Sequence, residues 1–297
     1  MFKLLKPADA IDGVTAEVVE DTICNGVRLT TLKIRYHRMI HAEFLRHRVF
    51  SRGAGSSRAI PVTKMAASAD ATPVSWGTNQ AGMQAGADLT GWRLVTVQLL
   101  WLIAMHIARR LSIWMAKAGA HKQLANRLTE PYQWMTEVIT GTDWDNFFNQ
   151  RDHEKAQPEI QVIARKIREA IALSEPRQVG RLTCDPFNWH LPFVLPHERV
   201  KASEMGYDSA SPMENCHFLA KLSSARCARV SYWNHDGSAP QAVKDLGLFD
   251  KLTEDSQAIH ASPMEHPAHP TSHGKRRVRN FRGWKQFRVM VEAGEVQ

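Results

Sequence analysis

Residues 16–36, AEVVEDTICNGVRLTTLKIRY, decide the fold class of this chain. Residues 16–24 and 27–36 are rich in β-branched side chains and roughly alternate between apolar and polar positions, as half-buried strands do. Asn25-Gly26 separates the two runs, and this dipeptide readily supplies the positive φ that a type I′ turn needs at both central positions. The segment therefore predicts a β-hairpin that opens an antiparallel sheet.

Beyond the hairpin the apolar residues change to helical spacing. Residues 39–45 predict a short helix, and the Ser- and Gly-rich residues 51–57 that follow predict a flexible loop. Residues 66–91 are rich in Ala, Gly, Ser, Thr and Asn and predict a long loop or lid, whereas residues 92–128 and 159–173 predict helices. We expect an α/β (α+β) protein whose mixed or antiparallel sheet is flanked by helices.

The most apolar run is residues 94–105, LVTVQLLWLIAM. His106, Arg109 and Arg110 end it well short of the roughly 20 residues that span a bilayer, so we expect a helix buried in the core. The opening residues, MFKLLKPADAIDG, lack the apolar run and the cleavage site of a secretory signal. These two features predict a cytoplasmic protein with no membrane segment.

The second half of the chain begins with residues 184–196, which are rich in proline and aromatic residues. We expect an irregular crossing there, and a division of the chain at about residue 184. Residues 211–222 and 240–252 predict helices, and residues 275–288, KRRVRNFRGWKQFR, are a candidate for a basic helix.

The composition sets limits on function. The 297 residues, 43% of them hydrophobic, can bury a large core, which excludes a disordered chain. Lys+Arg 38 against Asp+Glu 30 gives a net charge of +8, which favours anionic partners. The four cysteines form no CxxC pair and argue against a disulfide framework. Prolines interrupt the histidines of residues 260–273, so these form no i, i+4 pair on a helix, and we expect no metal.

The densest cluster of titratable residues is Arg46-His47-Arg48, followed after seven residues by Ser56-Ser57-Arg58. Cationic side chains beside hydroxyls and the free N–H groups of a Gly-rich loop suit a phosphate or an anionic ring. On composition alone, a solvated basic helix end is the commoner interpretation of such a cluster.

The order RHR, seven residues, Ser resembles the RHRx7S signature of the flavin-dependent thymidylate synthases, and here it stands as RHRVFSRGAGS over residues 46–56. A second block resembles the nucleotide-site run of the same family. That block comprises Arg127 with Pro131 four residues on, then NFF at residues 146–148, Arg151 and AQPEI at residues 156–160.

Two further blocks resemble the flavin-contacting motifs of the family: ARVSY at residues 228–232 and HASPMEH at residues 260–266. In the family both motifs normally precede RHR, and here both follow it. We infer a circularly rearranged member of the family, a change that proteins tolerate when the old termini lie close together at the surface.

The resemblance implies a homotetrameric enzyme that methylates dUMP at C5 to dTMP, with methylenetetrahydrofolate as carbon donor, NADPH as reductant and FAD as hydride carrier. Residues 1–183 would bind the nucleotide and residues 184–297 the flavin, packed into one catalytic unit. The implied substrate-binding residues are Glu43, Arg46, Ser56, Ser57, Arg58, Arg127 and Arg151, of which Arg46, Ser56 and Arg151 would be catalytic. The implied cofactor-binding residues are Arg46, His47, Arg48, Asn146, Ser231, His260, Ser262 and Glu265.

Two departures from the family pattern leave the substrate open. Gly53-Ala54 stands where the family usually has Asn-Glu, and Glu43 stands where Gln is common. A related enzyme that accepts dCMP, or that transfers a hydroxymethyl group, therefore stays an alternative. A nucleic-acid-binding protein is a more distant one, suggested by the net charge and residues 275–288; its binding would weaken steeply with salt.

Overall fold

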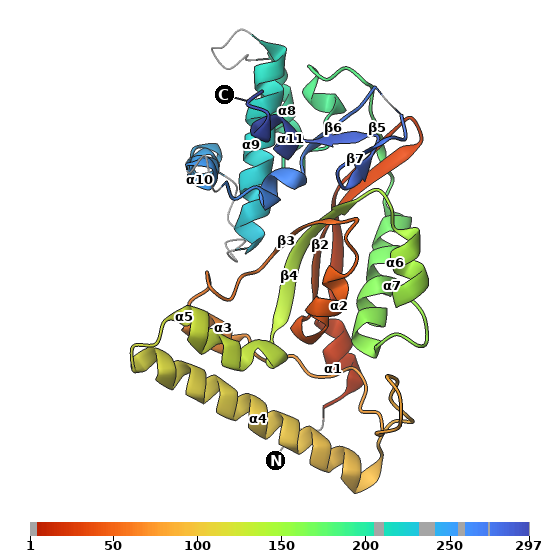
Figure 1. The fold of residues 1–297 in the computed structure, drawn as a ribbon, viewed down its shortest axis with the longest axis vertical. Helices are drawn as coiled ribbons and strands as arrows, with labels where there is room; N and C mark the ends of the chain where they lie inside the picture. The colour runs from red at the N-terminus through yellow and green to blue at the C-terminus, as the bar shows by residue number, and fades with distance from the viewer. Residues whose placement is uncertain (1–4, 205–210, 232–240, 255–258, 273, 297) are drawn as a thin grey trace.

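The computed structural model describes residues 5–204, 211–231, 241–254, 259–272 and 274–296. Its centre is a five-stranded sheet in the order β3-β4-β2-β1-β5 (Figure 1). All neighbouring strands are antiparallel except β1 and β5, which are parallel. The mixed sheet flanked by helices confirms the expected α/β (α+β) class. The strands are β1 Thr15–Cys24, β2 Val27–His37, β3 Ser51–Ala54, β4 Trp134–Gly141 and β5 Arg177–Gln178.

The predicted hairpin is confirmed as β1 and β2. Asn25 has φ 50° and Gly26 has φ 73°, the positive values that a two-residue type I′ turn requires. Cys24 pairs with Val27 directly across the turn, and the register shifts once, between Val18 and Glu20. The turn chemistry therefore sets the pairing of the two longest strands in the sheet.

Helices surround the sheet in the first part of the chain. The predicted helix at residues 159–173 is confirmed as α7, which packs on β1 and β2. Residues 66–91 lie mostly outside regular elements, as expected, apart from a bridge between Gly77 and Asp88. The elements are α1 Pro7–Asp12, η1 Arg38–Ile40, α2 His41–Leu45, α3 Val62–Ala67, α4 Gly91–Lys117, α5 Lys122–Ala125, η2 Asn126–Tyr132, α6 Asp145–Arg151 and α7 Pro158–Leu173.

The second part of the chain adds four helices and short strands among the described residues. The predicted helices there are confirmed as α9 and α10, and residues 184–196 are irregular apart from one short 3-10 turn and the start of α8. The elements are η3 Pro186–Asn188, α8 Pro196–Glu204, α9 Pro212–Ser231, α10 Ala242–Thr253, η4 Ser262–Glu265, β6 Ala268–Pro270, β7 Arg277–Val278, β8 Phe281–Arg282, β9 Trp284–Gln286 and α11 Phe287–Glu292.

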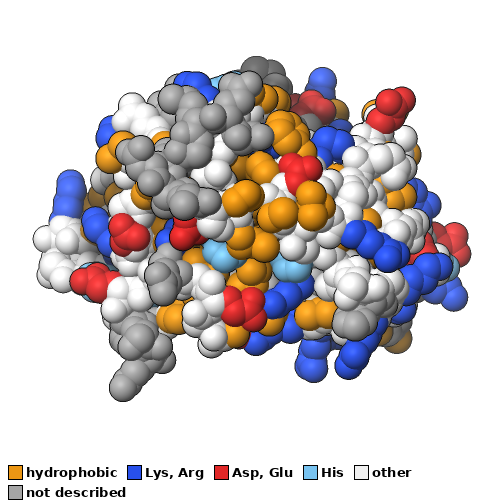
Figure 2. All heavy atoms as spheres, turned by 90° about the horizontal axis from the view of Figure 1, so that it is seen from above, with side chains coloured by type: hydrophobic (Ala, Val, Ile, Leu, Met, Phe, Trp, Pro, Cys, Tyr) orange, Lys and Arg blue, Asp and Glu red, His pale blue; other side chains and the backbone are white. Residues whose placement is uncertain are grey.

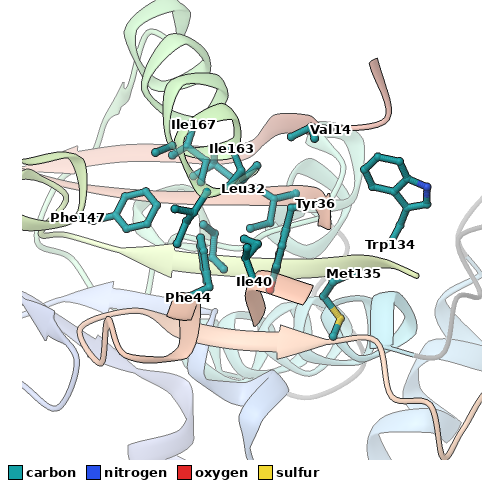
Figure 3. Close-up of a cluster of buried hydrophobic side chains, with 14 of the residues drawn as sticks. Val14, Leu32, Tyr36, Ile40, Phe44, Trp134, Met135, Phe147, Ile163 and Ile167 are labelled. Carbon is teal, nitrogen blue, oxygen red and sulfur yellow. The ribbon is translucent and has the colours of Figure 1, made fainter. Parts of the chain in front are cut away.

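One face of the sheet carries the largest hydrophobic core (Figure 3). Leu32 and Tyr36 of β2 meet Ile163 and Ile167 of α7 there, and all four are fully buried. The even-numbered residues of β2 point to this face because side chains alternate along a strand. Phe44 of α2 packs into the same core, so the helix that precedes the RHR run is held by the sheet.

The opposite face of the sheet is covered by the second half of the chain. Val138 of β4 packs against Cys227 and Val230 of α9. Thr31 and Thr140 are register partners on neighbouring strands, and their hydroxyl oxygens lie 2.6 Å apart on this face. Helix α9 contacts both β3 and β4, which brings the second half of the chain onto the strand that follows RHR.

Two sequence predictions are wrong in their secondary structure. Residues 51–57 begin with the edge strand β3, because Ser51 to Ala54 find backbone partners along β4. Residues 275–288 form β7, β8 and β9 instead of a basic helix. Arg279 has φ 54° and Gly283 has φ 69°, and positive φ at two such positions is incompatible with a continuous helix.

The prediction of a buried helix at residues 94–105 is also wrong. These residues do form a helix, α4, but Gln98 and Ser112 are its only buried residues. By length and composition α4 is the one described helix that could cross a membrane, and only 11% of its most apolar 18-residue window is buried. The apolar composition predicted the helix correctly and its burial wrongly.

Candidate functional site

A cavity of about 370 Å³ lies where strand β3 and the loop after it meet the second half of the chain. Ser56, which ends the RHRx7S block, and Arg58, two residues further on, line one side. His260 and Ser262, from the HASPMEH block, line the other, and Ala228 of the ARVSY block also contributes. Three sequence blocks that are far apart along the chain therefore share one cavity. Its remaining lining residues are Arg52, Gly53, Ala54, Ala59, Leu252 and Pro263.

The side-chain amide of a buried residue, Asn126, holds the loop that carries Ser56 and Arg58. Asn126, which is fully buried, donates from Nδ2 to the carbonyl oxygens of Ser57 (2.7 Å) and Ile60 (2.9 Å). Lys122 Nζ donates to the Ala59 carbonyl at 2.9 Å. These bonds fix the backbone on both sides of Arg58 while its own guanidinium stays exposed. An exposed cation on a fixed backbone is well placed to receive an anionic ligand.

The turn that carries Ser262 is held by its C-terminal residues. Glu265 accepts a 2.5 Å hydrogen bond from Nη1 of Arg288, and His266 is fully buried with Nδ1 2.8 Å from the Thr140 hydroxyl. Burial lowers the pKa of His266 to about 3, so this imidazole is neutral. The bonds of Glu265 and His266 therefore fix the backbone of the turn, while His260 and Ser262 stay exposed.

The RHR run forms a second cluster that does not line the cavity. Arg46 and Arg48 are exposed, whereas His47 is buried and accepts a 2.8 Å hydrogen bond on Nε2 from Nε of Arg151. Burial, with the nearby charges of Arg151 and Arg52, lowers the pKa of His47 to about 4. His47 is therefore a neutral acceptor that orients Arg151. The structure brings Arg46, His47 and Arg151 together, and none of them lines the cavity that Ser56 and Arg58 line.

Glu43 lies beside this second cluster. One of its carboxylate oxygens, Oε2, is buried without a hydrogen-bond partner among the described residues. Burial lowers the pKa of Arg151, and the charge of Glu43 counteracts that effect. Glu43 therefore acts on Arg151 as a nearby counter-charge.

The remaining predicted residues lie at several places. Arg127 is half exposed and pairs with Glu130 at 2.8 Å, directly after the residue that holds the Ser57 loop. Asn146 is exposed on α6 and accepts a hydrogen bond from Gln150. Ser57 is buried and contributes its carbonyl to the loop anchor. Ser231 ends α9, and its side chain lies outside the described part of the structure.

The described residues hold no candidate metal cluster, and three of the four cysteines are buried. Within them, no group of three His, Cys, Asp or Glu side chains could hold a metal ion. Cys24, Cys216 and Cys227 are buried, and burial raises the pKa of Cys216 to about 12. Such a thiol stays protonated and is a poor nucleophile.

Sequence reasoning missed three residues near the clusters, of which Arg52 connects the cavity to the RHR run: Arg52, Asn126 and Glu137. Arg52 donates from Nη2 to the His47 carbonyl, and its guanidinium lies 5.6 Å from the Phe44 ring centroid. Glu137 is fully buried on β4 next to β3. Asn126 directly precedes Arg127, and that adjacency is the one sequence signal that marked its position.

The fold and the cavity define a mixed α/β protein with a polar, partly cationic pocket at one edge of the sheet. No family model and no curated protein matches the chain. Among solved structures it is similar to a UMP/dUMP methylase, PolB from Streptomyces cacaoi, bound with 5-Br dUMP: 14% identity, a TM-score of 0.45, and coverage of 54% of this chain and 90% of that chain. The same methylase bound with 5-Br UMP gives 14% identity, a TM-score of 0.44, and coverage of 54% and 88%.

Proposed function

We propose that this chain is a rearranged flavin-dependent thymidylate synthase that methylates dUMP at C5, with methylenetetrahydrofolate as carbon donor and NADPH as reductant. One observation carries the proposal: the RHRx7S, ARVSY and HASPMEH blocks, which are scattered in the sequence, meet at a single cavity. A chance match of short motifs gives no reason for the matched segments to be neighbours in space. The rearranged order is then a change of connectivity around an unchanged site.

Several cations are available for the phosphate of the nucleotide. Arg58 projects from the fastened loop, and Arg127 lies one residue from the buried amide that fastens it. Two guanidinium groups offer paired N–H donors to a phosphate dianion, which is the geometry that Arg supplies best. Ser56, on the cavity wall, supplies a hydroxyl that donates or accepts.

Arg151 is the residue we assign to the pyrimidine ring. His47 accepts from its Nε, so the terminal N–H groups stay oriented toward a ligand. A cation held against the ring carbonyls stabilises negative charge that develops on the ring, and so raises the nucleophilicity of C5. The four cysteines are not needed for this chemistry, which agrees with the buried state of the three described above.

The donor set of the second half suits a flavin. His260 and Ser262 offer polar atoms at the cavity wall, and Ala228 with Leu252 offers an apolar surface for a ring. A cavity of about 370 Å³ accommodates one ring system with its nearest substituents and not two complete ligands. Bound flavin would supply the hydride; Glu265 is engaged by Arg288 and would act by fixing the turn.

Arg46, His47 and Arg151 lie outside the cavity lining, and in this proposal they serve a site shared between subunits. Arg46, His47 and Arg151 would complete the cavity of another copy, which is the arrangement that the homotetrameric family implies. In this proposal the active assembly is a homotetramer in the cytoplasm. The exposed Arg46 and Arg48, for which the described structure offers no salt bridge, are then available to a ligand held by a neighbour.

The nucleic-acid alternative is weakened by the state of residues 275–288. Arg277 and Arg282 both pair with Asp143 at 2.7 Å, and Arg288 pairs with Glu265 and Glu292. Lys and Arg do gather along one side of the face in Figure 2, but a cation paired within its own chain has less charge to offer phosphates. The dCMP and hydroxymethyl alternatives remain compatible with Gly53-Ala54 and Glu43.

The deciding experiment is an absorption spectrum of the purified protein with added FAD, followed by titration with dUMP and with dCMP. We expect the bands of bound oxidised flavin and a spectral change with dUMP. Mass spectrometry of the product from a complete reaction distinguishes methyl from hydroxymethyl transfer. A protein that takes up no flavin contradicts the proposal, and a response to dCMP alone changes the substrate.

A further inference from the structure

We propose that α4 pairs antiparallel with α4 of a second copy, about a two-fold axis at Ile103. The helix lies along the lower edge of the molecule in Figure 1, away from α8–α11. Seven large apolar side chains on its outward side are between 42% and 74% exposed: Trp92, Val95, Leu100, Ile103, Ile107, Leu111 and Trp114. This inference rests on the surface of α4 and not on the proposed reaction.

The exposed residues form a single stripe. At about 100° per residue, Trp92 and Trp114 both point within about 20° of Ile103 around the helix axis. Gln98 and Ser112, the buried residues of α4, point to the opposite side, where Gln98 bonds the backbone of Leu5. On the inward side Trp101 also packs against Trp76 and Tyr132. The outward side is apolar and uncovered in the described structure, which is unusual for a monomer surface.

The stripe is nearly palindromic. Trp92 and Trp114 are each eleven residues from Ile103, and Val95 and Leu111 are each eight residues from it. Leu100 and Ile107 follow the same symmetry with the centre displaced by half a residue. A two-fold interface joins the same patch on both copies, so residue i meets residue j and j meets i. An antiparallel α4 pair would therefore set Trp92 against Trp114 of the second copy and Val95 against Leu111 of the second copy.

The charges favour the same direction. Helix α4 carries Arg93, Arg109, Arg110 and Lys117 and no acidic residue. Arg110 points near the centre of the stripe, and the antiparallel register sets it beside Thr96 of the second copy. A parallel pair would set Arg110 against its own equivalent, two like charges in a largely apolar contact with no acid nearby. The antiparallel arrangement keeps the two Arg110 side chains about 21 Å apart along the helices, and each then lies about one turn from Arg93 of the second copy.

The area is sufficient for a stable contact. With each exposed apolar side chain of the stripe leaving roughly 100 Å² in solvent, two copies would bury more than about 1,000 Å² on pairing. An apolar and basic helix would also suit an anionic membrane surface. The palindrome distinguishes the two occupants, because a lipid surface places no symmetry requirement on the stripe.

Cysteine cross-linking tests the register. In a Cys184→Ser background, Ile103→Cys should form an interchain disulfide with itself under mild oxidation. Thr96→Cys and Arg110→Cys should each cross-link little alone, because about 21 Å of helix separates each from its own equivalent across the axis. Mixed together, they should form a hetero-linked dimer. Self-linking of Thr96→Cys and of Arg110→Cys would mean a parallel pair and overturn the proposal, as would no linking at Ile103.

A second measurement separates pairing from membrane binding. Leu100→Glu with Ile107→Glu should halve the mass seen by sedimentation, whereas Val243→Glu, at an 84% exposed apolar residue of α10, should leave it unchanged. The wild-type assembly should not float with vesicles of phosphatidylcholine and phosphatidylglycerol. An unchanged mass in the double variant overturns the proposal. Flotation without cross-linking at Ile103 also overturns it, and would mean that the stripe binds lipid.

Discussion

The Tyr36 hydroxyl donates a 2.6 Å hydrogen bond to Oε2 of Glu137 on the neighbouring strand, and both residues are fully buried. Nδ1 of His41 lies 2.6 Å from the same hydroxyl oxygen. The second carboxyl oxygen of Glu137 has no hydrogen-bond partner in the described chain. Burial raises the pKa of Glu137 from 4.5 to about 7, against the hydrogen bond from Tyr36 and the charge of Arg52, which lower it.

This pair predicts a pH-dependent stability. Between pH 4.5 and about 7 the folded carboxyl stays protonated while the unfolded one ionises, so the free energy of unfolding falls as pH rises through this window. Glu137→Gln removes the effect, and its stability relative to wild type should increase by on the order of 2–3 kcal/mol from pH 4.5 to pH 8. Urea unfolding at several pH values measures it. Plots of unfolding free energy against pH that stay parallel for wild type and Glu137→Gln would contradict the prediction. Glu169→Gln, on the exposed side of α7, is the control.

Arg58→Ala should weaken dUMP binding by tenfold or more and leave flavin bound. The guanidinium is exposed at the cavity, so its removal takes away one of the two guanidinium groups assigned to the phosphate. Calorimetric titration of dUMP and the flavin spectrum of the same sample give the two readouts. Arg181→Ala, another exposed arginine, should change neither. Loss of both ligands together would count against the separate roles of the loop and the HASPMEH turn.

Asn126→Ala should act on the loop from a distance. It removes two hydrogen bonds and leaves the carbonyls of Ser57 and Ile60 without their donor, which should cost about 1–3 kcal/mol of stability. Because the backbone of Arg58 then loosens, dUMP affinity should fall several-fold even though Asn126 does not line the cavity. Asn149→Ala, at an exposed position of α6, is the matched control. Unchanged affinity in a destabilised variant would make the anchor purely structural.

The sequence predicted the elements whose pattern is local. The hairpin follows from Asn25-Gly26, and α7 follows from one-sided apolar spacing in residues 159–173. Strand β3 was missed because four residues gain their pairing from β4, more than 80 positions later in the chain. The burial of α4 was predicted wrongly because an apolar run looks the same in sequence whether the core of its own chain or another molecule covers it.

The candidate site was predicted in part for the same reason. The motif blocks identified Ser56, Arg58, His260 and Ser262, which the structure brings to one cavity. Asn126 and Glu137 carry no motif, since their importance lies in being buried beside distant backbone or side-chain groups. The basic run at residues 275–288 was misassigned because its cations find acids elsewhere in the chain, such as Asp143.

A buried ion-pair network should determine the stability of the second half. Arg226 of α9, 2% exposed, donates to Glu198 at 2.6 Å and to Asp245 at 2.9 Å, and Arg229 also reaches Asp245. Asp245→Ala leaves Arg226 partly uncompensated and should destabilise the fold by about 3–5 kcal/mol. Thermal and urea unfolding measure the loss, with Asp250→Ala on the exposed side of α10 as control. A difference below about 1 kcal/mol would mean that the pair contributes little.

Hydrogen bonds connect two buried histidines across the sheet. His190 lies 2.8 Å from the Thr22 hydroxyl and 2.7 Å from that of Thr31, which meets Thr140 and then His266. Burial lowers the pKa of both imidazoles, that of His266 to about 3, so their stabilising effect is present above pH 6.5 and is lost as pH falls toward 3. Nitrogen-15 spectra should show both rings neutral from pH 8 down to pH 5.

Thr140→Val interrupts this chain of bonds at its centre without changing the volume of the side chain. His266 Nδ1 and the Thr31 hydroxyl then lose a partner, which should cost about 1–3 kcal/mol and alter the tautomer signals of His266 before those of His190. Thr136→Val, on the same face of β4, is the control because no described hydrogen bond involves its hydroxyl. Equal effects of the two variants would show that strand packing, and not the hydrogen-bonded chain, fixes the turn that carries Ser262.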